Sequence, residues 1–268
     1  MSSPPITSLQ NQRVKDAAKL RERRQRDKQH RILIDGVREL RRAITAGVAL
    51  REIFVCEPLC RTVEARRLLD SLDSCGAEIL PVTPEVFAKL AFGDRAEGVL
   101  GVARTPAARL DDLKPPSGAL VAVVEGVEKP GNLGAVLRSA DAAGVSALIA
   151  AGHGVDLFSP NVIRASLGTV FTLPVAAASA EETKRWLAER SFRVFAARVD
   201  AERLYTDVSY AGDAAIVLGS EAAGLSDIWS GPDVTPVKLP MCGAADSLNI
   251  SAAAAVIFYE ALRQRQSR

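Results

Sequence analysis

The sequence has few of the residues that bind structural metals. Its 268 residues include four cysteines and two histidines, and no two cysteines form a CxxC pair. A structural zinc site needs four such ligands at close spacing, so no metal is expected. Free thiols are typical of a reducing compartment, which predicts a protein of the cytoplasm.

Long apolar runs and two common nucleotide-binding motifs are also missing. No signal-peptide pattern and no run of membrane-spanning length is found, so no membrane partner is expected. No GxGxxG follows the first strand of the C-terminal half, which argues against a dinucleotide-binding domain. The absence of GxxxxGK[ST] excludes the common nucleoside triphosphatases.

Charge is distributed unevenly along an otherwise ordinary soluble chain. The hydrophobic fraction is 48% and the charged fraction 25%, but residues 10–51 hold 13 Lys and Arg against 5 Asp and Glu. The stretch KLRERRQRDKQHR within it suits a polyanion such as RNA, with Arg23, Arg24 and Arg31 as candidate contacts. A solvated amphipathic helix is the alternative interpretation of the same run.

The chain divides into two predicted α/β domains of unequal size. Residues 105–118 are rich in proline and turn formers, and we interpret them as a linker between residues 1–104 and 119–268. Apolar strands separated by helices in the larger part predict a mostly parallel sheet covered on both faces. Strands are expected at 31–36, 51–56, 77–82, 99–104, 119–127, 147–151, 172–178, 193–199, 214–221 and 234–240. In the larger part helices are expected near 132–143, 160–168, 181–190 and 249–264.

Ligands of parallel sheets bind beyond the carboxyl ends of the strands, which singles out the loops 126–132, 219–224 and 240–249. The helix after the first loop carries Arg138 on a face whose neighbours are Gly131, Gly134 and Ala135. A charged side chain among such small residues suggests that another molecule approaches it. An exposed ion pair with Asp141 is the alternative.

The other two loops combine small residues with polar ones. Glu221 lies between Gly219 and Gly224, just after a buried strand, where it has either a functional role or a capping or ion-pairing one. In the third loop, Ser247 is placed to cap the following helix and Asn249 lies in its first turn. Small residues expose backbone groups that can contact a purine and a ribose, which favours an adenosine-type cofactor.

Three ordered stretches then carry a family resemblance. EKPGNLGAVLRSADAAGV (residues 128–145), LGSEAAGL (218–225) and LPMCGAADSLNIS (239–251) resemble the three motifs of the SpoU (TrmH-like) RNA 2′-O-ribose methyltransferases. RILIDGVRELRRAITAGV, residues 31–48, is similar to the substrate-binding domain that many members carry. The resemblance implies a C-terminal α/β domain with a trefoil knot, following a small N-terminal α/β domain that binds RNA.

The resemblance also implies a cofactor, a partner and a set of site residues. The cofactor would be S-adenosylmethionine, held in the knot, and members form homodimers. Residues matching the cofactor site are Leu218, Gly219, Leu239, Met241, Gly243 and Leu248. Residues matching the catalytic face are Asn132, Arg138, Glu221, Ser247 and Asn249.

Proton removal from the ribose 2′-hydroxyl is the chemical difficulty of the implied reaction. The family arginine that Arg138 matches is the proposed base, yet a free guanidinium has a pKa above about 12. We therefore expect Arg138 to bind phosphate and orient the hydroxyl, with base catalysis as an additional role. Asn132 would position Arg138 or the ribose, and Ser247 and Asn249 would form hydrogen bonds near the reacting centre.

The sequence also departs from the family pattern, and the substrate stays open. Glu125 and Lys129 stand where members often have acidic residues, which bears on substrate identity. SPNVIRASLGTVFTLPV (residues 159–175) resembles a region that contacts RNA in relatives, which makes Arg164 and Ser166 further RNA-binding candidates; helix capping and surface charge are the alternative. The N-terminal domain favours rRNA over tRNA. A non-catalytic RNA-binding assembly factor and a base methyltransferase are the competing functions.

Overall fold

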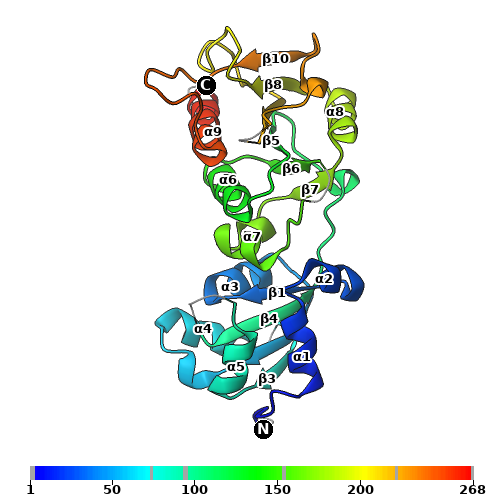
Figure 1. Cartoon of the computed structure of the whole chain (residues 1–268), viewed down its shortest axis with the longest axis vertical. Coiled ribbons are helices and arrows are strands. Elements are labelled where there is room, and N and C mark those ends of the chain that lie inside the picture. Colours follow the sequence, from blue (N-terminus) through cyan, green and yellow to red (C-terminus); the bar gives the residue numbers. More distant parts are fainter. Residues whose placement is uncertain (1–3, 73–74, 93–95, 153–154, 221–222, 267–268) are drawn as a thin grey trace. The chain divides into compact units, whose positions relative to one another are not determined.

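Short apolar runs rich in valine, isoleucine and leucine form the strands of two separate sheets (Figure 1). The computed structural model of the protein describes residues 4–72, 75–92, 96–152, 155–220 and 223–266. The chain divides into two units. Unit 1 comprises residues 1–106 and 158–172, and unit 2 comprises residues 107–157 and 173–268.

Unit 1 contains a four-stranded mixed sheet in the order β1-β4-β2-β3. Its strands are β1 (Arg31–Asp35), β2 (Leu50–Val55), β3 (Glu78–Pro81) and β4 (Val99–Arg104). β4 runs antiparallel to both of its neighbours, whereas β2 and β3 are parallel. Gly101 of β4 leaves room for the next layer, because a Cβ there would lie 2.7 Å from Leu40.

The helices of unit 1 begin at residues that can satisfy free backbone N–H groups. Asn11, Thr62 and Thr83 each accept a hydrogen bond from the first turn of the helix that follows. The helices are α1 (Gln12–Lys19), α2 (Arg23–Gln29), α3 (Val37–Thr45), α4 (Val63–Ser71) and α5 (Pro84–Leu90), with a 3-10 turn at Glu57–Leu59. Side chains of α1 and α5 share one core with the strands, and α3 contacts α4.

The segment 158–172 returns to unit 1 from the C-terminal half of the sequence. It holds α7 (Pro160–Ala165) and a 3-10 turn (Thr169–Phe171) and contacts β1 and α3. Arg42 Nη1 donates to the Leu167 carbonyl oxygen at 2.6 Å. The chain therefore passes between the units three times, which differs from the expected division into two contiguous domains.

Unit 2 contains a six-stranded sheet in the order β10-β8-β9-β5-β6-β7, and all of its neighbouring strands are parallel. Its strands are β5 (Leu120–Glu125), β6 (Ala147–Ala151), β7 (Val175–Ala178), β8 (Arg193–Ala197), β9 (Ala214–Leu218) and β10 (Val234–Val237). The mixed α/β class with a parallel sheet is confirmed. The trefoil knot stays a prediction.

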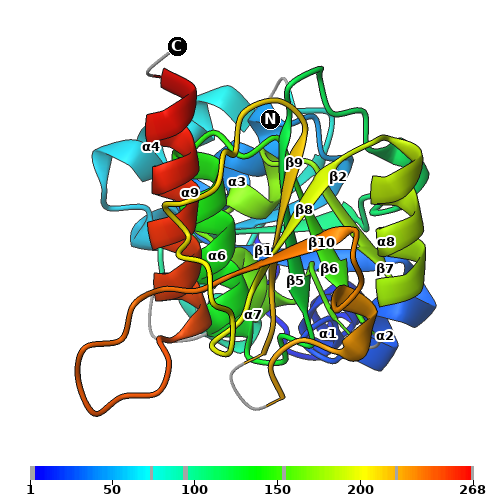
Figure 2. The same cartoon turned by 90° about the horizontal axis from the view of Figure 1, so that it is seen from above.

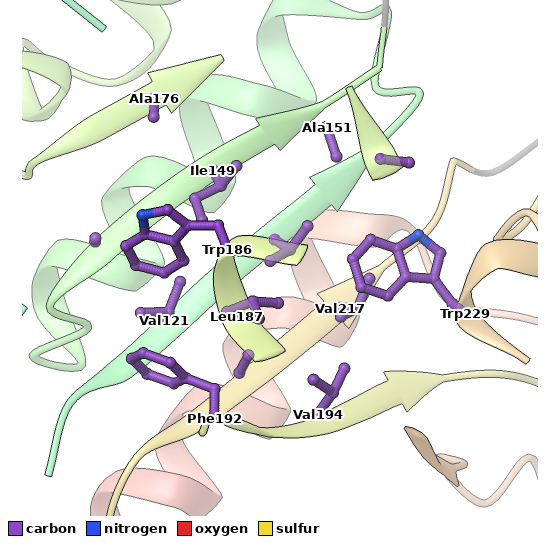
Figure 3. Close-up of a cluster of buried hydrophobic side chains, with 14 of the residues drawn as sticks. Val121, Ile149, Ala151, Ala176, Trp186, Leu187, Phe192, Val194, Val217 and Trp229 are labelled. Atoms are coloured by element: carbon purple, nitrogen blue, oxygen red, sulfur yellow. The ribbon is translucent and has the colours of Figure 1, made fainter. Parts of the chain in front are cut away.

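Helices cover both faces of the unit 2 sheet (Figure 2). α6 (Pro130–Ala142) and α9 (Ile250–Gln266) pack side by side on one face, and α8 (Ala180–Glu189) lies on the other. A 3-10 turn at Asp227–Trp229 brings Trp229 into the core beneath α8, where Trp186 is also buried (Figure 3). This core fixes the sheet whose carboxyl edge carries the three loops.

The predicted linker is partly integrated into unit 2. A 3-10 turn at Leu110–Asp112 precedes Leu113, which is 5% exposed and belongs to the core. The Ala177 N–H donates to the Ala108 carbonyl oxygen at 2.9 Å and so ties the segment to β7. Only its first residues, up to Pro106, fall in unit 1.

Within the described residues, no helix combines the length and apolar character needed to cross a bilayer. Among the same residues, no group of three or more histidine, cysteine or acidic side chains is arranged to hold a metal ion.

Candidate active site

The three loops predicted from the sequence lie at one edge of the unit 2 sheet, since β5, β9 and β10 are parallel. The first loop leads into α6 and the third leads into α9, and the two helices pack together. Asn249 Nδ2 donates to Asn132 Oδ1 at 3.3 Å, which joins the beginnings of these helices. Two predicted catalytic residues that are 117 positions apart are therefore in contact.

Arg138 projects from the outer face of α6. Leu133, Val136, Leu137 and Ala140 are buried on the opposite side, as the helical spacing predicts. The Arg138 side chain is exposed, which leaves its guanidinium open to solvent. The ion pair with Asp141 stays an alternative interpretation. Gly134, expected on the Arg138 face, is buried instead.

The second loop is held tightly at both ends. A Cβ on Gly219 would lie 2.3 Å from the Gly224 carbonyl group, so only glycine fits there. The Gly224 N–H donates to the Ser220 carbonyl oxygen at 2.9 Å. Glu221, the predicted catalytic carboxylate, lies outside the described residues.

Glu125 fixes the far end of this second loop from β5. Its carboxylate accepts hydrogen bonds from the backbone N–H of Ser226 at 2.8 Å and from Ser226 Oγ at 2.7 Å. The residue was noted from the sequence only as a departure from the family pattern. A carboxylate at a strand end was the available signal, but its partner is 101 positions away.

The third loop corrects the expected helix cap. α9 begins at Ile250, and Asn249 Oδ1 accepts hydrogen bonds from Ser251 N at 2.9 Å and Ser251 Oγ at 2.6 Å. Asn249, rather than Ser247, therefore caps the helix. Its amide performs two tasks, because the oxygen caps α9 while the nitrogen contacts Asn132. Ser247 is exposed.

A cavity of about 610 Å³ is bounded largely by this loop. Its walls include four predicted cofactor residues, Leu239, Met241, Gly243 and Leu248, together with Ser247. Met241 is 36% exposed and Leu248 is 41% exposed, high values for large apolar side chains. Leu218 is buried at the end of β9, and neither it nor Gly219 lines the cavity.

Several cavity residues were not anticipated from the sequence. Arg198, Val199 and Leu204 come from the connection between β8 and β9, Lys238 follows β10, and Ala253 comes from α9. A larger cavity of about 830 Å³ shares Arg198 but contains none of the predicted site residues. No motif marks the β8–β9 connection, so its place beside the third loop follows only from strand order.

Arg198 is anchored between two segments. Its guanidinium donates to both carboxylate oxygens of Asp200 at 3.0 and 3.1 Å and to Ser230 Oγ at 2.8 Å. The hydrogen bond from Arg198 lowers the pKa of the Asp200 carboxyl. The side chain is therefore committed to protein partners rather than available to a ligand.

The sequence profile of the SpoU rRNA Methylase family matches residues 119–259. The chain belongs to this family. A second profile, the MRM3-like substrate binding domain, matches residues 11–101 in unit 1. As a SpoU member, the protein is an S-adenosylmethionine-dependent RNA methyltransferase, in agreement with the three motifs.

Relatives match almost the whole SpoU chain. A 23S rRNA (uridine(2479)-2′-O)-methyltransferase of Streptomyces viridochromogenes is 32% identical, over 93% of this chain and 88% of the relative. A solved RNA 2′-O ribose methyltransferase is 44% identical with a TM-score of 0.86, covering 98% of this chain and 100% of the other. The SpoU methyltransferase AviRb from S. viridochromogenes, solved with AdoMet, is 29% identical with a TM-score of 0.86, covering 96% and 99%.

The RNA-binding candidates of the SpoU chain fall into two groups. Arg24 on α2 is exposed, Arg23 lies 3.7 Å from Asp27, and Arg31 lies 3.8 Å from Glu52. The Arg23–Asp27 pair is exposed and therefore weak, whereas the Glu52 side chain beside Arg31 is only 16% exposed.

Arg164 and Ser166 have structural roles instead. Arg164 Nη1 donates to the Phe92 carbonyl oxygen within unit 1. Ser166 is fully buried, and its hydroxyl donates to the Ile163 carbonyl oxygen at 3.0 Å. Segment 158–172 packs against β1 and α3, which withdraws Ser166 from solvent. The sequence-based assignment of Ser166 to RNA is contradicted by this burial, and Arg164 is engaged with its own unit.

The surroundings of Arg164 contain buried acidic groups. Asp35 is 7% exposed, and burial raises the pKa of its carboxyl to about 6 against the opposing charge of Arg164. Asp35 Oδ2 accepts a hydrogen bond from the Phe92 N–H at 2.5 Å. Glu39 is also buried, and desolvation raises the pKa of its carboxyl.

Proposed function

We propose that this protein transfers a methyl group from S-adenosylmethionine to a ribose 2′-hydroxyl of rRNA. The single observation that carries the proposal is the third-loop cavity, which gathers Ser247 with four residues matched to the cofactor site. Family membership supports the chemistry, and the substrate-binding profile over residues 11–101 supports a large structured RNA. The named relative is a 23S rRNA enzyme.

The residues around the cavity fit the cofactor. Its volume of about 610 Å³ lies in the range of about 300–1,000 Å³ typical of small-molecule sites. Met241 and Leu248 offer exposed apolar surface for a purine ring, and the small residues Gly243 and Ala245 leave backbone groups accessible. Ser247 adds a hydroxyl at the same wall.

The proposed chemistry assigns separate tasks to the polar residues. The cofactor supplies an electrophilic methyl group on a sulfonium. With the cofactor bound, the ribose 2′ oxygen would take the methyl group as the carbon–sulfur bond breaks, which would leave a neutral thioether, and the 2′ proton would pass to water. Arg138 binds an RNA phosphate and orients the hydroxyl, since its exposed guanidinium is available for an incoming anion.

The asparagine pair has a positioning task in this scheme. Asn132 and Asn249 hold the starts of α6 and α9 at a fixed separation through their 3.3 Å contact. Glu125 does the same for the second loop through Ser226. Together these contacts hold the ribose site and the cofactor cavity in fixed positions relative to each other.

One experiment tests both the reaction and its substrate class. Purified protein is incubated with S-adenosylmethionine carrying a radiolabelled methyl and with separate pools of unmodified rRNA and tRNA. Label in an alkali-resistant 2′-O-methyl dinucleotide from rRNA is the expected result. Label from tRNA alone would mean that the substrate is tRNA rather than rRNA. Label in a base would contradict ribose methylation. Cofactor binding with no label in naked RNA calls for assembly intermediates as substrate, and no binding at all would favour a non-catalytic factor.

We further propose that the protein acts as a homodimer in the cytoplasm, joined through α9. Val256 is 39% exposed and Tyr259 is 50% exposed, and with Ala252 they form an apolar strip at helical spacing. A second copy of the chain fits this strip. Light scattering of the wild type should give twice the chain mass of 28.5 kDa, and Tyr259→Glu should give a monomer. A monomeric wild type would contradict the dimer.

A further inference from the structure

The connection between β8 and β9 forms one wall of the cofactor cavity without regular structure of its own. Residues 198–213 contain no helix or strand, yet Arg198, Val199 and Leu204 line the cavity. Leu204 forms a parallel bridge with Lys238. The Tyr205 N–H donates to the Lys238 carbonyl oxygen at 3.0 Å, and the Lys238 N–H donates to the Arg203 carbonyl oxygen at 2.9 Å. The wall therefore depends on where residues 203–205 are held.

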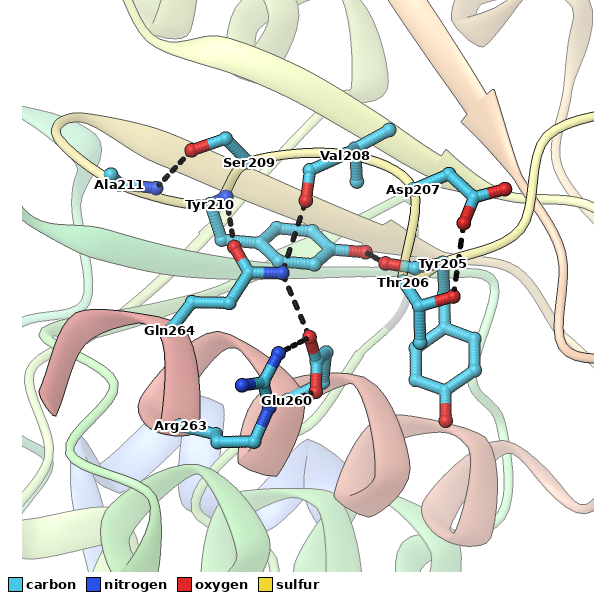
Figure 4. A network of polar contacts seen from close by, with 10 residues as sticks. All are labelled: Tyr205, Thr206, Asp207, Val208, Ser209, Tyr210, Ala211, Glu260, Arg263 and Gln264. Atoms are coloured by element: carbon cyan, nitrogen blue, oxygen red, sulfur yellow. Dashed lines mark hydrogen bonds and ion pairs between the residues drawn. The ribbon is translucent and has the colours of Figure 1, made fainter. Parts of the chain in front are cut away.

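Tyr210 connects this wall to the rest of the same segment (Figure 4). Its side chain is fully buried, and the ring packs edge-on against Phe195 with the centroids 4.9 Å apart. The phenol oxygen donates to the Tyr205 carbonyl oxygen at 2.9 Å. The buried Tyr210 side chain thus holds the Tyr205 backbone in place through this hydrogen bond.

Gln264 of α9 holds the far end of the segment with both atoms of its amide. Its Oε1 accepts the Tyr210 N–H at 2.9 Å, and its Nε2 donates to the Val208 carbonyl oxygen at 3.0 Å. Nε2 also donates to Glu260 Oε1 at 2.8 Å, which fixes the rotamer. Figure 4 shows the amide between the segment and the helix.

We propose that Gln264 and Tyr210 are positioning residues of the cofactor cavity. They hold residues 203–205 against Lys238, so their loss loosens the wall and weakens cofactor binding without changing the chemistry. The inference rests on the proposed cofactor site. It assigns a function to the last turns of α9, a region that none of the three motifs includes.

The test compares Gln264→Met with wild type. Methionine has a similar length but no donor and only a weakly accepting sulfur, so the donated contact is lost and the accepted one is weakened while the volume is kept. Calorimetry should show about tenfold weaker binding of S-adenosylmethionine, and its KM should rise by the same factor. The kcat at saturating cofactor and the KM for RNA should stay unchanged. Hydrogen exchange at the Tyr210 amide should accelerate.

Matched variants separate positioning from general stability. Arg263→Met removes the ion pair to Glu260 from an arginine side chain that is 66% exposed, and this variant should bind cofactor like wild type. Tyr210→Phe deletes the hydroxyl but keeps the ring, and it should weaken binding about threefold. The Tyr210→Phe variant keeps the proposal testable if Gln264→Met does not fold. A lower melting temperature with unchanged affinity and KM would overturn the proposal.

Leu248→Asp distinguishes this inference from the cofactor site on which it rests. A charge at the cavity wall should abolish cofactor binding. If Leu248→Asp binds like wild type, the proposed cofactor site fails. If Leu248→Asp does not bind while Gln264→Met binds like wild type, the site stands and the positioning role fails.

Discussion

Arg138 and Arg164 are similar in sequence and differ in structure. Each lies in a helix that begins with Pro-Gly-Asn or Pro-Asn, and both were candidates for contact with RNA. Arg138 is exposed, whereas Arg164 donates to the Phe92 carbonyl oxygen beside the buried Asp35. An arginine is available to a ligand only when its own unit leaves its donors unused.

The largest expected effect is that of Arg138→Ala. Because the guanidinium would bind phosphate and orient the 2′-hydroxyl, methylation should fall by about 10²–10⁴-fold. Cofactor affinity and melting temperature should stay near wild type, since Arg138 is exposed on α6. Single-turnover assays measure the methylation rate, and calorimetry measures cofactor affinity and melting temperature. Turnover at the wild-type rate would exclude Arg138 from the reaction.

Arg164→Met should have the opposite profile. The variant removes the hydrogen bond to Phe92 and the charge that opposes Asp35, which should destabilise unit 1 by about 2 kcal/mol. Both tryptophans, Trp186 and Trp229, lie in unit 2, so their fluorescence is an internal control. Circular dichroism in urea should show an earlier transition while fluorescence is unchanged. If unfolding were unaltered and RNA binding were weaker, Arg164 would contact RNA rather than stabilise unit 1.

Asp35 should make the stability of unit 1 depend on pH. Its pKa in the folded protein is about 6, above the ordinary 3.8, so the folded state holds the proton more tightly. The associated stability is present below pH 4 and is lost as the pH rises through 6, by about 3 kcal/mol at most. Arg164, Glu39 and Glu97 are the charged groups that act on it.

Asp35→Asn is neutral throughout and should lack this loss. The difference between the variant and wild type in urea unfolding, followed by circular dichroism at pH 4.5 and pH 7.5, measures it. The variant should gain stability relative to wild type at the higher pH. An equal difference at both values would mean that Asp35 does not titrate in this interval.

The smallest effect is expected for Arg24→Ala. An exposed arginine on α2 that contacts one phosphate should weaken RNA binding a fewfold and reduce the salt dependence by about one unit of slope. Binding isotherms at several salt concentrations measure both, with Arg51→Ala as the matched exposed control. A slope identical to wild type would place the RNA elsewhere on unit 1.

Most elements of the fold could be predicted from local pattern. The expected strand at 119–127 contains β5, and the expected helix at 181–190 is α8 within one residue. The placement of elements whose partners are distant in the sequence was harder to predict. The segment expected as a helix at 160–168 is α7, but its membership of unit 1 follows from contacts with β1 and α3.

In the candidate site, too, features set by local pattern were predicted and features set by distant partners were not. The three motif loops were expected at one edge because parallel strands bring their carboxyl ends together, and the Asn132–Asn249 contact agrees. Ser247 was the wrong cap, since several polar residues near a helix start satisfy the same local rule. Arg198, Leu204 and Gln264 were missed because nothing near them in sequence indicates the cavity.

The sequence by itself determined the periodicities, the order of the strands and helices, and the three motifs that identify a SpoU methyltransferase. These depend on residues within one or two turns of each other, where backbone geometry and apolar spacing dominate. Only the tertiary structure decided which polar side chains are available. Burial and hydrogen bonding depend on partners such as Ser226 for Glu125 and Tyr210 for Gln264, which local pattern does not contain.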